Sequence, residues 1–126
     1  ELGEAWDIAK VYWNAMSESK MREGLRKLRD AGEQTFFEGM DPDGPMPHFV
    51  TADEHLSCAV DATAFVDRKM AAMKAYPTQI QLDGPFFALS NNVGDTAWGV
   101  EYYRLAKGAL GPLGEDGLET DLFAGL

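Results

Sequence analysis

The chain has 126 residues, of which 45% are hydrophobic and 11% aromatic, and a formal net charge of −10. This length and composition suit one globular domain with a modest core and exclude a disordered chain. The acid excess argues against nucleic acid and anionic membranes as partners, since both bind positive proteins. No apolar run approaches the roughly 18 residues that span a bilayer, no signal peptide is visible, and the single Cys58 indicates a reducing cytoplasm.

The amino-terminal part of the sequence predicts a strand followed by a helix. Residues 8 to 16 are rich in β-branched and aromatic residues, which favours a strand. Ser17 is expected to cap the helix and Gly32 to end it. One apolar stripe runs along this helix at the spacing i, i+4 and i+7: Met21, Leu25 and Leu28.

The same helix carries the basic cluster of the sequence. Its members are Lys20, Arg22, Arg26, Lys27 and Arg29. A solvated helix face is the favoured interpretation of such a cluster. Contact with an acidic neighbour or with an anionic ligand stays open as the alternative.

Residues 33 to 54 predict a long loop, because repeated Gly and Pro residues interrupt any regular pattern. The acidic residues gather between 33 and 63, where no Lys or Arg occurs, and this most simply favours solubility. The stretch from Asp41 to Gly44 only partly matches a calcium loop, since the third acid and the closing Glu are missing.

Five side chains at the end of this loop are of types that bind zinc. They are His48, Asp53, Glu54, His55 and Cys58. Their spacing matches no established ligand pattern, so two surface histidines and a core cysteine are the favoured interpretation.

A second strand and helix are predicted after the loop. Residues 56 to 60 indicate a short strand, and Asp61 is expected to cap the helix that follows. Val66, Met70 and Met73 recur at helical spacing and are expected to fill the core.

The stretch from Tyr76 to Asn92 begins at a predicted helix end. Pro77 disfavours helix at Tyr76, so residues 78 to 80 are expected to be extended. Residues 83 to 85 then predict a turn, and residues 90 to 92 a second, polar turn. The apolar side chains between these two turns are expected to be buried: Phe86, Phe87 and Leu89.

The carboxy-terminal part predicts one more strand, over residues 98 to 107, buried on at least one side. Residues 108 to 117 are rich in Gly and acids and are expected to be loose. Leu122 and Phe123 are apolar and are expected to dock back on a neighbouring surface, which would pin the terminus.

Several short motifs occur in a fixed order along the chain. They are Lys10-Val11-Tyr12-Trp13, Ala71-Ala72-Met73-Lys74-Ala75, Thr78-Gln79-Ile80, Phe87-Ala88-Leu89-Ser90-Asn91-Asn92, Glu101-Tyr102-Tyr103 and Glu119-Thr120-Asp121-Leu122-Phe123-Ala124-Gly125-Leu126. Together they resemble the carboxy-terminal part of the zinc-dependent deacetylases of the PIG-L/LmbE family. That family often has His-Ala at the positions of Tyr76 and Pro77.

The resemblance implies that residues 1–126 are the carboxy-terminal segment of such a deacetylase: an α/β chain with mixed strands and two main helices, next to a Rossmann-like zinc domain. The family's His-Pro-Asp-Asp-Glu and His-Pro-Asp-His motifs, which supply the zinc ligands and the general base, do not occur in this sequence. The zinc-binding, amino-terminal half is therefore expected to be absent, and the start at Glu1 without Met agrees with this. Catalytic residues and zinc ligands are expected in that half, which would be the main partner of this chain.

The resemblance also implies a reaction, the hydrolysis of the N-acetyl group of a GlcNAc-inositol sugar in mycothiol biosynthesis. Gln79 is the expected substrate-binding residue, since its amide can donate to and accept from sugar hydroxyls. A backbone-capping amide is the alternative for Gln79, and weaker pocket candidates are Tyr76, Asn91 and Asn92. Two other functions stay open: a mycothiol S-conjugate amidase, and a non-catalytic cap or homo-oligomerisation module.

Overall fold

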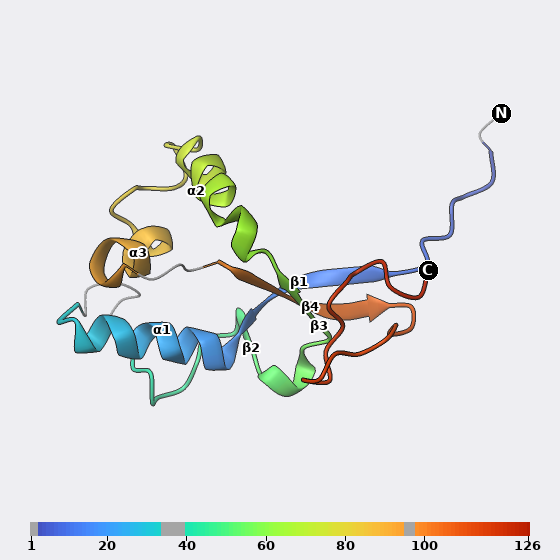
Figure 1. The fold of residues 1–126 in the computed structure, drawn as a ribbon, viewed down its shortest axis with the longest axis horizontal. Helices are drawn as coiled ribbons and strands as arrows, with labels where there is room; N and C mark the ends of the chain where they lie inside the picture. The colour runs from blue at the N-terminus through green and yellow to red at the C-terminus, as the bar shows by residue number, and fades with distance from the viewer. Residues whose placement is uncertain (1–2, 34–39, 95–97) are drawn as a thin grey trace.

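The structure is a computed structural model that describes residues 3–33, 40–94 and 98–126. Over this part of the chain it is a small α/β domain with a mixed sheet of strand order β2-β1-β4-β3. The strands are β1 (Val11–Ser17), β2 (Val50–Thr51), β3 (Cys58–Asp61) and β4 (Val100–Lys107). The α-helices are α1 (Glu18–Asp30), α2 (Val66–Lys74) and α3 (Ala88–Val93). The helices gather at one end of the molecule, and the sheet and the carboxy-terminal coil form the other (Figure 1).

The α/β class and the mixed strands are confirmed, and α3 is a short third helix beyond the two main helices predicted. β1 pairs antiparallel with β4 and parallel with β2, and β3 pairs antiparallel with β4. β1 therefore lies inside the sheet, next to a strand that is about 90 residues away in the sequence.

The first strand and helix form for the local reasons that the sequence predicted. The Ser17 hydroxyl accepts a hydrogen bond from the Lys20 N–H at 3.3 Å, which caps α1. The helix ends at Asp30, and Gly32 follows with a left-handed φ of 83°, which glycine adopts without strain. Leu25 and Leu28 are buried, so the predicted apolar stripe faces the core.

The predicted loop over residues 33 to 54 is wrong at its end. Residues 34–39 lie outside the described residues, but Val50 and Thr51 form β2 beside the end of β1, with Met16 opposite Val50. A 3₁₀ turn, Asp53–His55, follows. The β-branched pair at residues 50 and 51 was too short to stand out against the Gly and Pro residues before it.

The second helix starts later than its predicted cap. Asp61 is the last residue of β3, and its carboxylate accepts from the Thr63 N–H at 2.9 Å. That bond closes a turn just before the 3₁₀ turn Thr63–Phe65, which leads into α2. Val66 is buried as predicted, whereas Phe65 is exposed.

Two predictions between Tyr76 and Asn92 are wrong. Residues 78 to 80 are not extended, because the Tyr76 carbonyl accepts from the N–H groups of both Gln79 and Ile80, at 3.0 and 2.9 Å. Pro77 sits at the second position of this turn, which suits its fixed φ. Residues 90 to 92 belong to α3 rather than to a turn. Burial of Phe87 and Ala88 at the start of α3 overrides the turn preference of the polar residues that follow.

The core is small, and it lies mainly where α1 meets α3. A Cβ atom at Gly24 of α1 would lie 3.1 Å from Leu89 Cδ1, so the glycine permits the close approach of the two helices. The buried apolar residues are Leu25, Leu28, Cys58, Val66, Phe87 and Ala88. Phe86 was expected among them but is exposed.

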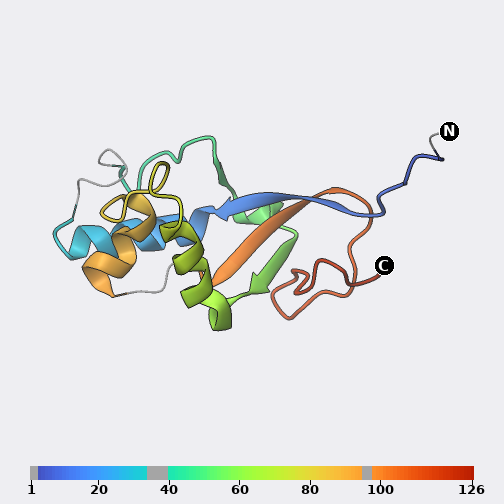
Figure 2. The ribbon, with the colours of Figure 1, turned by 90° about the horizontal axis from the view of Figure 1, so that it is seen from above.

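The carboxy-terminal coil is more ordered than predicted. Glu119 lies beside β3, where its carbonyl accepts from the Ala59 N–H at 2.8 Å and its N–H donates to the Ser57 carbonyl at 3.0 Å. Leu122 is half-buried, but Phe123 is 75% exposed, so the expected docking of Phe123 is wrong. The amino-terminal arm that begins at Gly3 and the carboxy terminus both lie at the sheet end of the molecule (Figure 2). Within the described residues, no helix has the length and apolar character that crossing a membrane requires.

Candidate functional site

Gln79, the predicted substrate-binding residue, lies in the connection between α2 and α3. Its side chain is exposed, and within the described residues no hydrogen bond involves its side-chain amide. The alternative role, an amide that caps the backbone at the end of α2, is therefore wrong. The donors and the acceptor of this amide are available to a ligand or to another part of a larger protein.

Asn91 and Asn92, the weaker pocket candidates, serve the structure of this connection. Asn91 Nδ2 donates to the Leu82 carbonyl at 2.8 Å, and Asn92 Nδ2 donates to the Ala88 carbonyl at 2.9 Å. The first bond ties the segment that follows Gln79 to α3. These two amides therefore help to position the connection, each through one of its two N–H donors.

Trp98 fixes the other side of the connection. Its Nε1 donates to the Phe86 carbonyl at 3.1 Å, and the two rings lie 5.7 Å apart. Its own carbonyl accepts from Lys69 Nζ of α2 at 2.5 Å. Trp98 has a φ of 73°, a left-handed conformation that is strained for a bulky residue. Gln79 thus lies in a connection whose later part is held to α3 at Leu82 and to Trp98 at Phe86.

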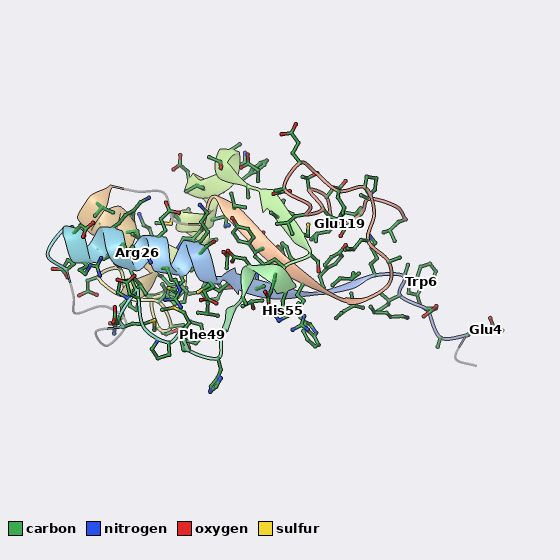
Figure 3. The ribbon with its side chains drawn as sticks, turned by 90° about the horizontal axis from the view of Figure 1, so that it is seen from below. Glu4, Trp6, Arg26, Phe49, His55 and Glu119 are labelled. Atoms are coloured by element: carbon green, nitrogen blue, oxygen red, sulfur yellow. The ribbon has the colours of Figure 1, made fainter. Side chains whose placement is uncertain are left out.

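A buried polar cluster at the opposite end of the molecule was not predicted. Glu119 is fully buried, and its Oε1 accepts from Lys10 Nζ at 2.7 Å and from the Gly111 N–H at 2.5 Å. Its Oε2 accepts from the Tyr12 hydroxyl, and Lys10 Nζ also donates to the Ala124 carbonyl at 2.7 Å. Figure 3 shows Glu119 between the sheet and the coil, whereas Glu4 and Trp6 lie on the amino-terminal arm outside the body.

The charges of this cluster are fixed by their contacts. Burial alone would raise the pKa of Glu119, but the hydrogen bonds from Lys10, Tyr12 and Gly111 outweigh burial and lower it. The hydrogen bond to Glu119 raises the pKa of Lys10. Burial, followed by the bond to Glu119, raises the pKa of Tyr12. Both carboxylate oxygens of Glu119 accept hydrogen bonds, and neither is exposed to solvent. The cluster therefore joins the coil to β1 and is not open to a substrate.

The five side chains considered for zinc do not form a ligand set. Within the described residues, no three His, Cys, Asp or Glu side chains lie close enough together to hold a metal ion. Asp53 instead accepts from the Ser17 hydroxyl at 2.7 Å, next to the start of α1. His48 and His55 are exposed, and Cys58 is fully buried with its pKa raised by burial. A surface position for the histidines and a core position for Cys58 are thus confirmed.

The basic cluster of α1 meets an acidic neighbour within this same chain. Arg26 and Arg29 approach the Asp43 carboxylate at 2.8 and 3.2 Å, and these bonds lower the pKa of Asp43. Arg22 donates to the carbonyls of Pro42 and Gly44 at 2.5 and 2.9 Å. The contact with an acidic neighbour is therefore right for Arg26 and Arg29, and both side chains also stay exposed, as predicted for a solvated face. The loop from Pro42 to Gly44 is held against α1, where Figure 3 places Arg26.

Comparison with known proteins finds close relatives that are much longer. The chain is 70% identical over all 126 residues to a protein of Nocardioides sp. named 1D-myo-inositol 2-acetamido-2-deoxy-alpha-D-glucopyranoside deacetylase. It is 59% and 49% identical, again over 126 residues, to proteins of the same name from Kribbella flavida and Geodermatophilus obscurus. The chain spans 42%, 41% and 42% of these three relatives. No protein-family model matches the chain.

Proposed function

We propose that this chain is the carboxy-terminal segment of a hydrolase that removes the acetyl group from 1D-myo-inositol 2-acetamido-2-deoxy-alpha-D-glucopyranoside. The observation that supports this most strongly is the 70% identity over every residue of the chain to the Nocardioides deacetylase. The relative is more than twice as long as this chain, and the proposal assigns the catalytic groups to the part that the segment does not contain. That part would include the Rossmann-like domain.

The segment contributes a substrate contact through Gln79 in this proposal. The side chain is exposed and has no internal hydrogen bond within the described residues, while the part of the connection that follows it is held at Leu82 and Phe86. An amide that is not engaged in the fold can bond a sugar hydroxyl without breaking an existing interaction. A rigid base for that amide reduces the entropy lost when the substrate binds.

In this proposal zinc is bound by the remaining part of the longer protein. The described residues do not fit a zinc ion, because no three suitable ligands converge and Asp53 and Glu119 are engaged in hydrogen bonds within the fold. The ligands and the general base are therefore assigned to the remaining part of the longer protein. What this chain supplies is a wall of the sugar site and the orientation of its substrate.

The test uses a full-length chimera in which this chain replaces the aligned segment of the Nocardioides deacetylase. Gln79→Ala should lower kcat/KM for the acetylated sugar about 10-fold, the loss of one hydrogen bond to a substrate, while the metal content stays unchanged. Gln81→Ala is the matched control, since Gln81 is also exposed and lies only two positions further along the chain. Equal kinetics for the two variants would remove Gln79 from the site.

The same chimera separates the deacetylase from the two other functions. The relatives named above carry the name of a deacetylase, which favours that activity over hydrolysis of mycothiol S-conjugates. Faster turnover of an S-conjugate than of the acetylated sugar would assign the chain to an amidase. Full activity of a protein from which this segment has been deleted would make the segment a non-catalytic module.

A further inference from the structure

Half of β1 has an open edge, although the strand lies inside the sheet. β2 pairs with β1 only at Met16 and Ser17, so within the described residues no strand pairs with the Val11 to Ala15 stretch on that side. The other side of this stretch is paired with β4 over its whole length. Figure 2 shows this part of β1 along the outer margin of the sheet.

The register determines which backbone groups this edge presents. The carbonyls of Gly99 and Tyr103 accept from the Ala62 and Ser57 N–H groups, so odd-numbered residues of β4 point their backbone groups toward β3. Even-numbered residues then point toward β1, where Arg104 is opposite Trp13.

Asn14 is opposite Tyr103, and Tyr12 is opposite Leu105, so both pairs are of the non-hydrogen-bonded kind. The N–H and C=O groups of Tyr12 and Asn14 therefore point to the open edge. Met16, two residues further on, points the same way and meets β2 there. The open edge thus continues the line along which β2 already pairs.

This edge lacks the features that usually block strand addition. Proteins protect an open edge with Lys, Pro or another covering element. Residues 12 to 15 read Tyr-Trp-Asn-Ala, and the nearby Lys10 is turned into the buried cluster, with its side chain 6% exposed. Trp13 is 61% exposed, and Phe49, which directly precedes β2, is exposed as well. Unpaired backbone groups beside exposed aromatic side chains form a surface suited to an added strand.

We propose that the edge formed by Tyr12 and Asn14 takes a β-strand from the part of the longer polypeptide that the relatives possess and this chain lacks. The inference rests on the proposed function only in that it places the chain within such a polypeptide. About three fifths of the Nocardioides relative lies outside the aligned segment, which is ample to provide a strand. A second copy of this chain is disfavoured as the occupant, because each copy carries a net charge of −10.

Amide hydrogen exchange tests the proposal on unmodified side chains. In the isolated 126-residue chain, the amides of Tyr12 and Asn14 should exchange quickly, while that of Trp13, which bonds to β4, is protected. In the full-length chimera, both fast amides should slow by at least about 100-fold. Fast exchange of both amides in the chimera overturns the proposal. Protection that appears in the isolated chain and grows with its concentration would assign the edge to a second copy instead.

A proline pair provides an independent test. Asn14→Pro removes an N–H that has no partner in the isolated chain, so the urea midpoint of that chain should stay close to the original. In the chimera the same change should lower the midpoint. Trp13→Pro, the control, removes an N–H that bonds to β4 and should lower the midpoint in both proteins. If the Asn14→Pro chimera and the unchanged chimera have equal urea midpoints, the proposal is overturned.

The outcome is separable from that of the proposed function. Protected amides in a chimera without deacetylase activity would leave the strand addition standing and remove the activity. Full deacetylase activity with fast exchange at Tyr12 and Asn14 would leave the activity standing and remove the strand addition.

Discussion

The ammonium nitrogen of Lys10 lies 2.7 Å from Oε1 of Glu119, although 109 positions separate the two residues in the sequence. The side chains are 6% and 0% exposed, so the pair is shielded from water. The Tyr12 hydroxyl and the Gly111 N–H complete the surroundings of the carboxylate. This pair joins the start of the first strand to the carboxy-terminal coil, and the stability of the sheet end depends on it.

Replacing Glu119 by Gln should destabilise the fold by about 3 kcal/mol at neutral pH, because Lys10 stays buried without an opposite charge. The free energy of unfolding of the 126-residue chain, from urea denaturation, measures this. Glu115→Gln is the control, since Glu115 is exposed in the same coil and should change stability little. A loss no larger than that of the control would mean that the pair contributes nothing net.

The contribution of Glu119 should also depend on pH. Its pKa in the folded chain is below the ordinary value of 4.5, so the unfolded chain takes up the proton first as the pH falls. The stabilisation is therefore complete above pH 4.5 and is lost as the pH falls through the lower, folded pKa. The stability difference between the unchanged chain and Glu119→Gln should shrink over that interval. If this difference in the free energy of unfolding stays constant as the pH falls, the charge of the Glu119 carboxylate does not stabilise the fold.

Tyr103 should ionise unusually late. The hydrogen bond from its hydroxyl to Glu101 Oε2, at 2.7 Å, and then burial raise its pKa from 10.0 to about 12. The neutral phenol therefore stabilises the fold below pH 10, and this contribution is lost as the pH rises toward 12. Glu101→Gln should move the pKa of Tyr103 back toward 10, measured by ultraviolet absorbance of tyrosinate. The part of the absorbance titration that disappears in Tyr103→Phe belongs to Tyr103. If that part still titrates near pH 12 in Glu101→Gln, the hydrogen bond to Glu101 is not what raises the pKa.

The cap of α1 should contribute measurably to stability. Ser17→Ala removes the bonds of its hydroxyl to the Lys20 N–H, to Asp53 and to the Ser19 hydroxyl, at an expected cost of about 1 to 2 kcal/mol. Thr78→Ala is the control, since it also removes a hydroxyl, but one that is exposed and has no hydrogen bond within the described residues. The two urea midpoints decide the matter. Equal midpoints would place the stability of α1 in its packing and not in its cap.

The elements that the sequence predicted well are those with local causes. Ser17 and Gly32 bound α1 because capping and left-handed turns act within a few residues. The predicted extension at residues 78 to 80 is wrong because a proline that ends a helix can also open a turn, and the sequence does not say which. The polar residues at 90 to 92 are helical because burial of Phe87 outweighs their preference for turns.

The polar contacts were less predictable than the elements. Asp43 faces Arg26 and Arg29 because the loop folds back on α1, a tertiary arrangement that spacing alone does not give. In the sequence, Glu119 is one of several acids in an acidic tail, and no pattern near it predicts a contact with Lys10. The exposed position of Gln79 agrees with a ligand contact, and that role stays a prediction.

The pairing of β1 with β4 governs when this domain folds during synthesis. Residues 11 to 15 bond to residues 102 to 107, so β1 is synthesised well before its partner β4. Until β4 is made, this edge of β1 is unpaired, and the chain between the two strands is a long loop whose closure costs entropy before any contact repays it. Folding of the sheet is therefore a late, concerted event. A chain that stops before β4 leaves this edge of β1 without its partner strand and is exposed to aggregation.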